Sequence, residues 1–343
     1  MPEYKELLKL LCDTMSIGGF EDHVFSEIKP VLDPLFDEVS IDNAKNIILR
    51  KNSQKGGKRK KLMIDAHIDE IGMLVSKVNP DGSLAVAPVG GFDKTILSAA
   101  DVFVYGRKKI FGVLVPPHEY TGRECDKKNP EIKEFRVDIG MSYEKAVSMV
   151  PVSSPIGYAC SISELNPDRL TGRSFDDKAC AAALICAAAN TPADESEYDV
   201  YVTLSSGEEI GQGGIKCAAV AIDPDLAIVT DVNFARTPGV GKAESGELGK
   251  GPMISLSAVT DRTFTEKIIS LAEKNAVPLQ KVVESTSTGT NATHLINQNR
   301  GIVTAVVSIP LSGMHSYNES LSLRDVAEFI RLISLVIKGV GEK

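Results

Sequence analysis

The sequence predicts an α/β fold in which a mostly parallel sheet carries helices on both faces and is interrupted by a small β-rich domain. From about residue 165 onward, helix-type and strand-type segments alternate, which is typical of parallel sheets with helical crossovers. Between residues 71 and 164, short strand-type runs follow one another with turn signals about every 8–12 residues. We therefore expect a catalytic α/β domain of residues 1–70 and 165–343, and an inserted β-barrel-like domain of residues 71–164.

The N-terminal segment predicts two helices and then short strands. Residues 3–14 and 21–33 carry Leu and Val at helical spacing, with Gly18 and Gly19 between the two segments. Strand-type runs follow at residues 38–41, 46–50 and 61–66.

The C-terminal half predicts five further helices and five strands. The expected helices are residues 177–189, 215–221, 263–275, 291–297 and 323–338. The expected strands are residues 198–204, 226–230, 252–258, 282–284 and 302–309.

Composition excludes several classes of function. The chain of 343 residues is 43% hydrophobic and 24% charged, as in ordinary globular proteins, and its net charge of −8 argues against a nucleic-acid partner. Its basic run at residues 51–61 is better explained as a solvated hairpin turn. No apolar run is long enough for a bilayer, the N-terminus lacks a signal-peptide pattern, and the six cysteines show no CxxC spacing, so we expect no membrane association and a cytoplasmic location.

Histidine or carboxylate residues follow five of the predicted strands. They are His67 with Asp69, Asp176 with Asp177, Glu208 with Glu209, Asp231, and His315. Because the carboxyl ends of parallel strands lie at one edge of a sheet, these side chains can converge although they span the chain. Two histidines with several carboxylates suit zinc or a similar divalent ion, and one shared carboxylate could bridge two ions.

Each residue also has a purely structural explanation. His67 alone could be a hydrogen-bonded core histidine, and Asp69 could orient its imidazole. One of Asp176 and Asp177 could cap the helix that starts there, and a Glu-Glu pair is usually solvated. Their joint occurrence after five strands favours a common site.

Six segments in fixed order carry a family resemblance. They are AHIDEIG (66–72), TGRSFDDKA (171–179), SSGEEIGQGG (205–214), TDVNFARTPG (230–239), STGTNATH (287–294) and SIPLSGMHS (308–316). Together they resemble the signature series of the M42 metallo-aminopeptidases, also called tetrahedral or glutamyl aminopeptidase-like, some of which carry an endoglucanase label. The resemblance runs almost end to end and implies a zinc-exopeptidase-like fold. The step of 109 residues from His67 to Asp176 leaves room for the inserted domain.

The resemblance implies two divalent metal ions per subunit, zinc or cobalt. His67 and Asp231 would hold one ion, Glu209 and His315 the other, and Asp176 would bridge them.

The same resemblance implies an aminopeptidase that releases N-terminal amino acids from short peptides by attack of a metal-bridging water. Glu208 would act as the general base and Asp69 would orient His67, while the peptide bond between Asp176 and Asp177 is often cis in such enzymes.

Homo-oligomers are also implied, in which the inserted domain forms dimers and the dimers assemble into a dodecamer. A loop at residues 116–134, including His118, is expected to reach a neighbouring active site. The chain departs from the family pattern at Ser312-Gly313, where a bulky pair is common, and at Asn291, where an aspartate is usual. Because of these departures, the sequence does not predict which N-terminal residue of a substrate peptide is preferred.

Two alternative functions remain. One is a related di-metal amidohydrolase of the same fold, such as a deacylase or a carboxypeptidase. The other is a non-catalytic assembly protein, which the complete ligand set and the additional Glu208 disfavour.

Overall fold

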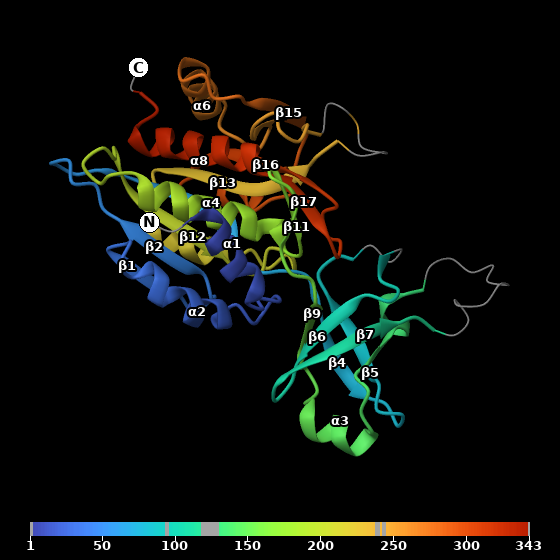
Figure 1. Cartoon of the computed structure of the whole chain (residues 1–343). Coiled ribbons are helices and arrows are strands. Elements are labelled where there is room, and N and C mark those ends of the chain that lie inside the picture. Colours follow the sequence, from blue (N-terminus) through green and yellow to red (C-terminus); the bar gives the residue numbers. More distant parts are fainter. Residues whose placement is uncertain (1–2, 93–95, 118–129, 237–240, 242–244, 342–343) are drawn as a thin grey trace.

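The computed structural model describes residues 3–92, 96–117, 130–236, 241 and 245–341. Within these residues an 11-stranded sheet forms the main body, and a closed barrel of strands stands beside one end of it (Figure 1). Most of the loop predicted at 116–134, including His118, lies outside the described residues.

The centre of the large sheet is parallel. Its strands, in spatial order, are β12 (Tyr198–Ser205), β3 (Lys60–His67), β13 (Leu226–Phe234) and β16 (Val303–Ser312). These strands consist mainly of buried aliphatic residues because helices cover both of their faces.

The flanks of the sheet are largely antiparallel, so the sheet is mixed and the prediction of a mostly parallel sheet is correct only for its centre. The flanking strands are β1 (Glu38–Ile41), β2 (Ile47–Lys51), β10 (Ser163–Asn166), β11 (Arg169–Gly172), β17 (Glu319–Ser322), β14 (Met253–Ser257) and β15 (Gln280–Glu284). Short turns join β1 to β2, β10 to β11 and β16 to β17, and a connection of that length permits only antiparallel pairing.

Alternation along the central strands divides the core into two layers. Leu62 and Ile64 of β3 face the larger core, whereas Met63 between them faces the smaller one. The larger core includes side chains of α1 (Tyr4–Asp13), α2 (Asp22–Leu32), α4 (Phe175–Asn190), α6 (Arg262–Lys274) and α8 (Leu323–Lys338). The smaller core includes those of α5 (Ile215–Ile222) and α7 (Ala292–Leu295). Helices therefore lie on both faces of the sheet, and all helices predicted from the sequence are present. Among the described residues, no helix combines the length and apolarity needed to cross a membrane.

The barrel has its own hydrophobic core. Its strands are β4 (Gly72–Val78), β5 (Leu84–Val89), β6 (Asp101–Tyr105), β7 (Lys109–Val115), β8 (Arg136–Asp138) and β9 (Pro155–Tyr158). Val75, Val102 and Leu114 point into it. Helix α3 (Tyr143–Met149) and the short 3-10 helix η3 (Ile132–Glu134) were not predicted, and α3 lies at the end of the barrel far from the sheet (Figure 1).

A buried ion cluster ties the end of β3 to helix α4. The carboxylate of Glu70 is 2% exposed and accepts a hydrogen bond from Arg173 at 2.7 Å, while Lys178 Nζ lies 3.2 Å away. The backbone N–H of Ser16 donates to the same carboxylate at 2.9 Å. Burial alone would raise the pKa of Glu70, but Arg173 and Lys178 outweigh burial and lower this pKa to about 2. Glu70 is therefore a charged group that the fold has fully compensated.

Replacing Glu70 with Gln should leave two buried cations without their anion. We expect Glu70→Gln to lower the free energy of unfolding by about 3–5 kcal/mol at neutral pH, measured by urea denaturation. The exposed control Glu273→Gln should have almost no effect, because that side chain is 71% exposed.

The difference in unfolding free energy between the wild type and Glu70→Gln should depend on pH. The folded-state pKa of Glu70, about 2, lies below its ordinary value of 4.5, so its stabilisation is complete above pH 4.5 and is lost as the pH falls toward 2. The stability difference between wild type and Glu70→Gln should shrink over that interval. A difference that stays constant throughout it would contradict the assignment.

Candidate metal centre

The predicted site residues converge at the carboxyl edge of the parallel strands. The pairing of β12 with β3 places Ser205 beside His67, and the pairing of β13 with β3 places Val229 beside Asp65, so Asp231 lies level with His67. Strand β13 continues to Phe234, so Asp231 lies within the strand and not after it as predicted. The other members come from the segment after β12, the first turn of α4 and the turn between β16 and β17.

Asp176 lies between the two histidines. Its Oδ1 is 2.9 Å from Nε2 of His67, and its Oδ2 is 3.2 Å from Nε2 of His315. Asp231 Oδ1 lies on the His67 side, 3.8 Å from Nε2, and Glu209 Oε1 lies on the His315 side, 3.3 Å from Nε2. The donors thus form two groups that share one carboxylate.

These donors also fit divalent ions in number and type. One ligand atom from each of His67, Asp176 and Glu209 lies within 4.8 Å of the other two, which is close enough to surround a single ion. Imidazole nitrogen and carboxylate oxygen are the ligands that zinc and similar ions take in catalytic sites.

Carboxyl groups outnumber histidines at this edge, and burial acts strongly on their pKa values. Burial raises the pKa of Asp231 well above its ordinary value, and the neighbouring Asp177 raises it further. Burial also raises the pKa values of Glu208 and Glu209. For Asp176, hydrogen bonds with His315 and His67 outweigh burial and lower the pKa. Burial thus favours the protonated form of these carboxyl groups, and bound divalent cations would favour their charged form.

Asp69 positions the site through both its backbone and its side chain. Its carbonyl oxygen is 3.0 Å from Nδ1 of His67, whereas its carboxylate Oδ1 is 3.6 Å away and therefore outside hydrogen-bond distance. The carboxylate accepts the backbone N–H groups of Glu208 at 3.0 Å and Glu209 at 3.1 Å. The imidazole is thus oriented by the backbone of Asp69, and the side chain fixes the Glu-Glu segment.

Sequence reasoning missed Glu319, the first residue of β17. It is 2% exposed, and its carboxylate accepts the backbone N–H of His315 at 2.9 Å and that of Asp176 at 3.1 Å. Burial, reinforced by the nearby Asp176, raises its pKa to about 8. Its place four residues after His315 in a tight turn was the available signal.

The departures from the family pattern lie beside the donors. Asn291 is buried and donates to Asp65 Oδ2 at 3.2 Å and to Ser205 Oγ at 2.9 Å, so it stabilises the layer beneath His67. Gly313, with φ of 77°, forms the turn that leads to His315.

The peptide bond between Asp176 and Asp177 is cis.

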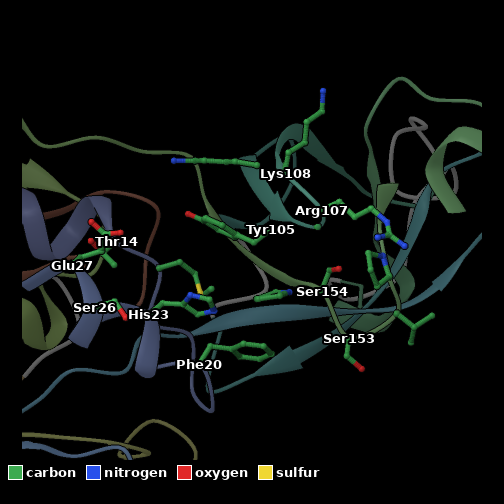
Figure 2. A pocket seen from close by; sticks show the side chains of 16 residues that line it. Thr14, Phe20, His23, Ser26, Glu27, Tyr105, Arg107, Lys108, Ser153 and Ser154 are labelled. Atoms are coloured by element: carbon green, nitrogen blue, oxygen red, sulfur yellow. The ribbon is translucent and has the colours of Figure 1, made fainter. Parts of the chain in front are cut away.

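A cavity of about 610 Å³ opens onto the two donor groups and is lined by all five of their side chains and by Glu208. A second cavity, of about 620 Å³, lies between α2 and the barrel, where Tyr105 of the barrel points toward the α2 side (Figure 2). The second cavity contains none of the predicted site residues. Within the described part of the chain, His67, Asp176 and Glu209, which span both donor groups, are the one set of three or more His, Cys or carboxylate side chains close enough together to hold a metal ion, and they line the first cavity. We therefore assign the chemistry to the first.

Comparisons with known proteins identify the family and relatives of this chain. The family model described as M42 glutamyl aminopeptidase matches residues 45–332. The lysyl aminopeptidase of Pyrococcus furiosus is 32% identical over 341 residues, covering 97% of this chain and 96% of the relative. The TET aminopeptidase structure from Thaumarchaeota archaeon SCGC AB-539-E09 superposes with a TM-score of 0.91 at 29% identity, covering 98% of this chain and 96% of that one. The TET1 peptidase of Pyrococcus horikoshii, described as assembling into a tetrahedron or a large octahedral shell, gives 0.84 at 29% identity, covering 98% and 99%.

Removing one hydrogen-bond acceptor from Glu319 should make the proposed metal ligands Asp176 and His315 less well positioned. In Glu319→Gln the amide oxygen can accept only on one side, so the N–H of Asp176 or of His315 loses its partner. We expect zinc affinity to fall about 10- to 100-fold, measured by competition with a chromogenic chelator. Glu273→Gln should bind zinc as the wild type does, and an unchanged affinity in Glu319→Gln would show that Glu319 does not position the ligands.

Proposed function

The chain belongs to the M42 glutamyl aminopeptidase family, and on that premise we propose that it is a two-metal aminopeptidase that releases single amino acids from the N-termini of short peptides. The observation that carries this proposal is the position of Asp176, which offers one carboxylate oxygen to each of two histidines. Glu208 lines the same cavity outside both groups of donors, as a proton-transferring group must.

The proposed ligands follow the two groups of donors. His67 and Asp231 would hold one ion, His315 and Glu209 the other, and Asp176 would contact both. Nitrogen and oxygen donors suit zinc and cobalt alike. Two such ions, when bound, lower the pKa of a water molecule and polarise the scissile carbonyl group.

The chain's own residues supply proton transfer and positioning. Glu208 accepts the proton of the attacking water and returns it to the amine that leaves. Asp69 holds the backbone of Glu208 and Glu209 at fixed positions, so the base and the adjacent ligand cannot exchange places. The acidic walls of the cavity favour entry of a free α-ammonium group.

The adjacent glutamates should respond differently to the same substitution. Glu208→Gln should keep the metal content of the wild type and lose about 10²- to 10⁴-fold in kcat on leucine and lysine p-nitroanilides. Glu209→Gln should lose metal, measured by elemental analysis after dialysis. A Glu208→Gln protein with full activity would contradict the role of Glu208 as the base.

The substrate terminus separates the proposal from the alternative amidohydrolases. An aminopeptidase should cleave Leu-Gly-Gly and leave its N-acetylated form intact, and amino acids should appear from the N-terminal end. Mass spectrometry of a timed digest measures both properties. Cleavage of the acetylated peptide alone would instead indicate a deacylase, and release from the C-terminus a carboxypeptidase.

We extend the proposal to self-assembly. The Pyrococcus horikoshii neighbour forms closed shells, and residues 71–164 of this chain are our proposed dimerisation domain. Phe111 of β7 and Val147 of α3 are 53% and 50% exposed on this domain, which supports a contact there. A mass in solution equal to one 36.8 kDa chain would contradict it. The cytoplasmic location stays a prediction from the sequence.

A further inference from the structure

We propose that Asp65 and Asn291 form a buried acid–amide pair that positions one wall of the metal-site cavity against the bound peptide. Both are then positioning residues for the reaction, and neither touches the substrate. The wall in question is the segment of residues 287–290, which lines the cavity together with the proposed metal ligands. This inference rests on the aminopeptidase function proposed above and concerns how the substrate is held.

The side chain of Asn291 connects to two strands of the parallel sheet. Its Nδ2 donates to Oδ2 of Asp65 on β3 at 3.2 Å and to Oγ of Ser205 on β12 at 2.9 Å. The Ser205 hydroxyl in turn donates to the same Oδ2 of Asp65 at 3.0 Å, so the three side chains form a closed triangle of hydrogen bonds. All three residues are buried, and water therefore does not compete for these bonds.

The two partners of Asn291 are fixed relative to the catalytic groups. Asp65 lies two residues before the proposed ligand His67 on β3, so their side chains lie on the same face of that strand. Ser205 ends β12, three residues before the proposed base Glu208. The amide of Asn291 is thus anchored to the segment that carries a metal ligand and to the segment that carries the base.

The wall segment ends directly before Asn291. Within it, Thr288 Oγ1 and Thr290 Oγ1 lie 2.8 Å apart, and Thr290 Oγ1 also accepts the backbone N–H of Ala292 at 3.2 Å. Among the described residues, these two threonine side chains form no hydrogen bond with a group outside residues 287–292. Asn291 is therefore the nearest side chain that ties the wall segment to the sheet.

Gly289 leaves the backbone of the wall segment bare. Its φ is 65°, and a Cβ atom at this position would have open space around it. Because Gly289 lines the cavity, its peptide groups are accessible to a bound peptide, and backbone groups of this kind commonly hydrogen-bond the backbone of a peptide ligand. A displaced wall segment should therefore weaken substrate binding.

The pair requires one acid and one amide. The Asp65 carboxylate accepts from the N–H group that Asn291 supplies. An aspartate at position 291, which is usual in the family pattern, would instead bring a second carboxyl group against Asp65, and two carboxylates in contact disfavour each other's charged form. The departure from the family pattern at Asn291 is thus matched by the acid at Asp65.

The experiment exchanges the acid and the amide. In zinc-loaded protein, Asn291→Asp should lower kcat/KM for Leu-Gly-Gly about 10- to 100-fold, mainly through a higher KM. Asp65→Asn should have a smaller effect, because its amide oxygen can still accept from Asn291. The double variant Asp65→Asn with Asn291→Asp again has one donor and one acceptor, so its KM should return to within about threefold of the wild type. Asn297→Asp, the same substitution at an exposed position, should leave KM unchanged.

The KM values separate positioning from a role in stability alone. All variants are assayed at a temperature at which circular dichroism shows them to be folded. A role in stability alone would lower the unfolding temperature of Asn291→Asp and leave its KM at the wild-type value. That result, or a double variant with a KM no lower than that of Asn291→Asp, would refute the inference.

A binding measurement separates this inference from the aminopeptidase proposal. Calorimetric titration with Leu-Gly-Gly is carried out on the same variants, zinc-loaded and in a Glu208→Gln background that slows cleavage. The affinity should fall in Asn291→Asp and return in the double variant. If this pattern is present but no protein with Glu208 cleaves the peptide, the aminopeptidase proposal fails and the positioning stands. If the peptide is cleaved but the affinity is the same in all variants, the positioning is refuted and the aminopeptidase proposal stands.

Discussion

The arrangement of this molecule depends on carboxylates buried together at the carboxyl edge of its parallel strands. Asp176 is placed between two imidazoles, and it is surrounded by Asp231, Glu208 and Glu209, whose charged forms burial disfavours. Such a concentration of buried charge is unfavourable unless cations share it. The metal requirement that we propose is thus a consequence of electrostatics as well as of family membership.

The contrast with Glu70 shows why the two clusters have different roles. Glu70 is as buried as the site carboxylates, but Arg173 and Lys178 compensate it, and its pKa is lowered to about 2. The Glu70 cluster stabilises the junction of β3 and α4, from which His67 and Asp176 emerge. The Glu70 cluster, whose charges are compensated, stabilises the scaffold. We propose that the site carboxylates beside it, which have no such compensation, bind metal ions.

The residues of the candidate site were easier to predict from the sequence than the flanking strands and the side chains that hold them in position. The convergence of the candidate site residues could be predicted because runs of aliphatic residues indicate strands, and the carboxyl ends of parallel strands lie at one edge of the sheet. These residues are His67, Asp176, Glu209, Asp231 and His315. The antiparallel flanks were missed because β10, β11 and β17 are short and partly polar, without a clear apolar period. Glu319 acts in part through a contact with a residue distant in sequence, the backbone N–H of Asp176. The contact with Asp176 has no local sequence pattern, and only the spacing of four residues from His315 could have indicated Glu319.

The central claim is that Asp176 connects two cation sites. Its most direct test is a crystal structure of the zinc-loaded protein with anomalous diffraction measured at the zinc absorption edge. The account predicts two anomalous peaks per chain, one beside His67 and Asp231 and one beside His315 and Glu209, with Asp176 in contact with both. A single peak at saturating zinc, or two peaks of which only one touches Asp176, would contradict it.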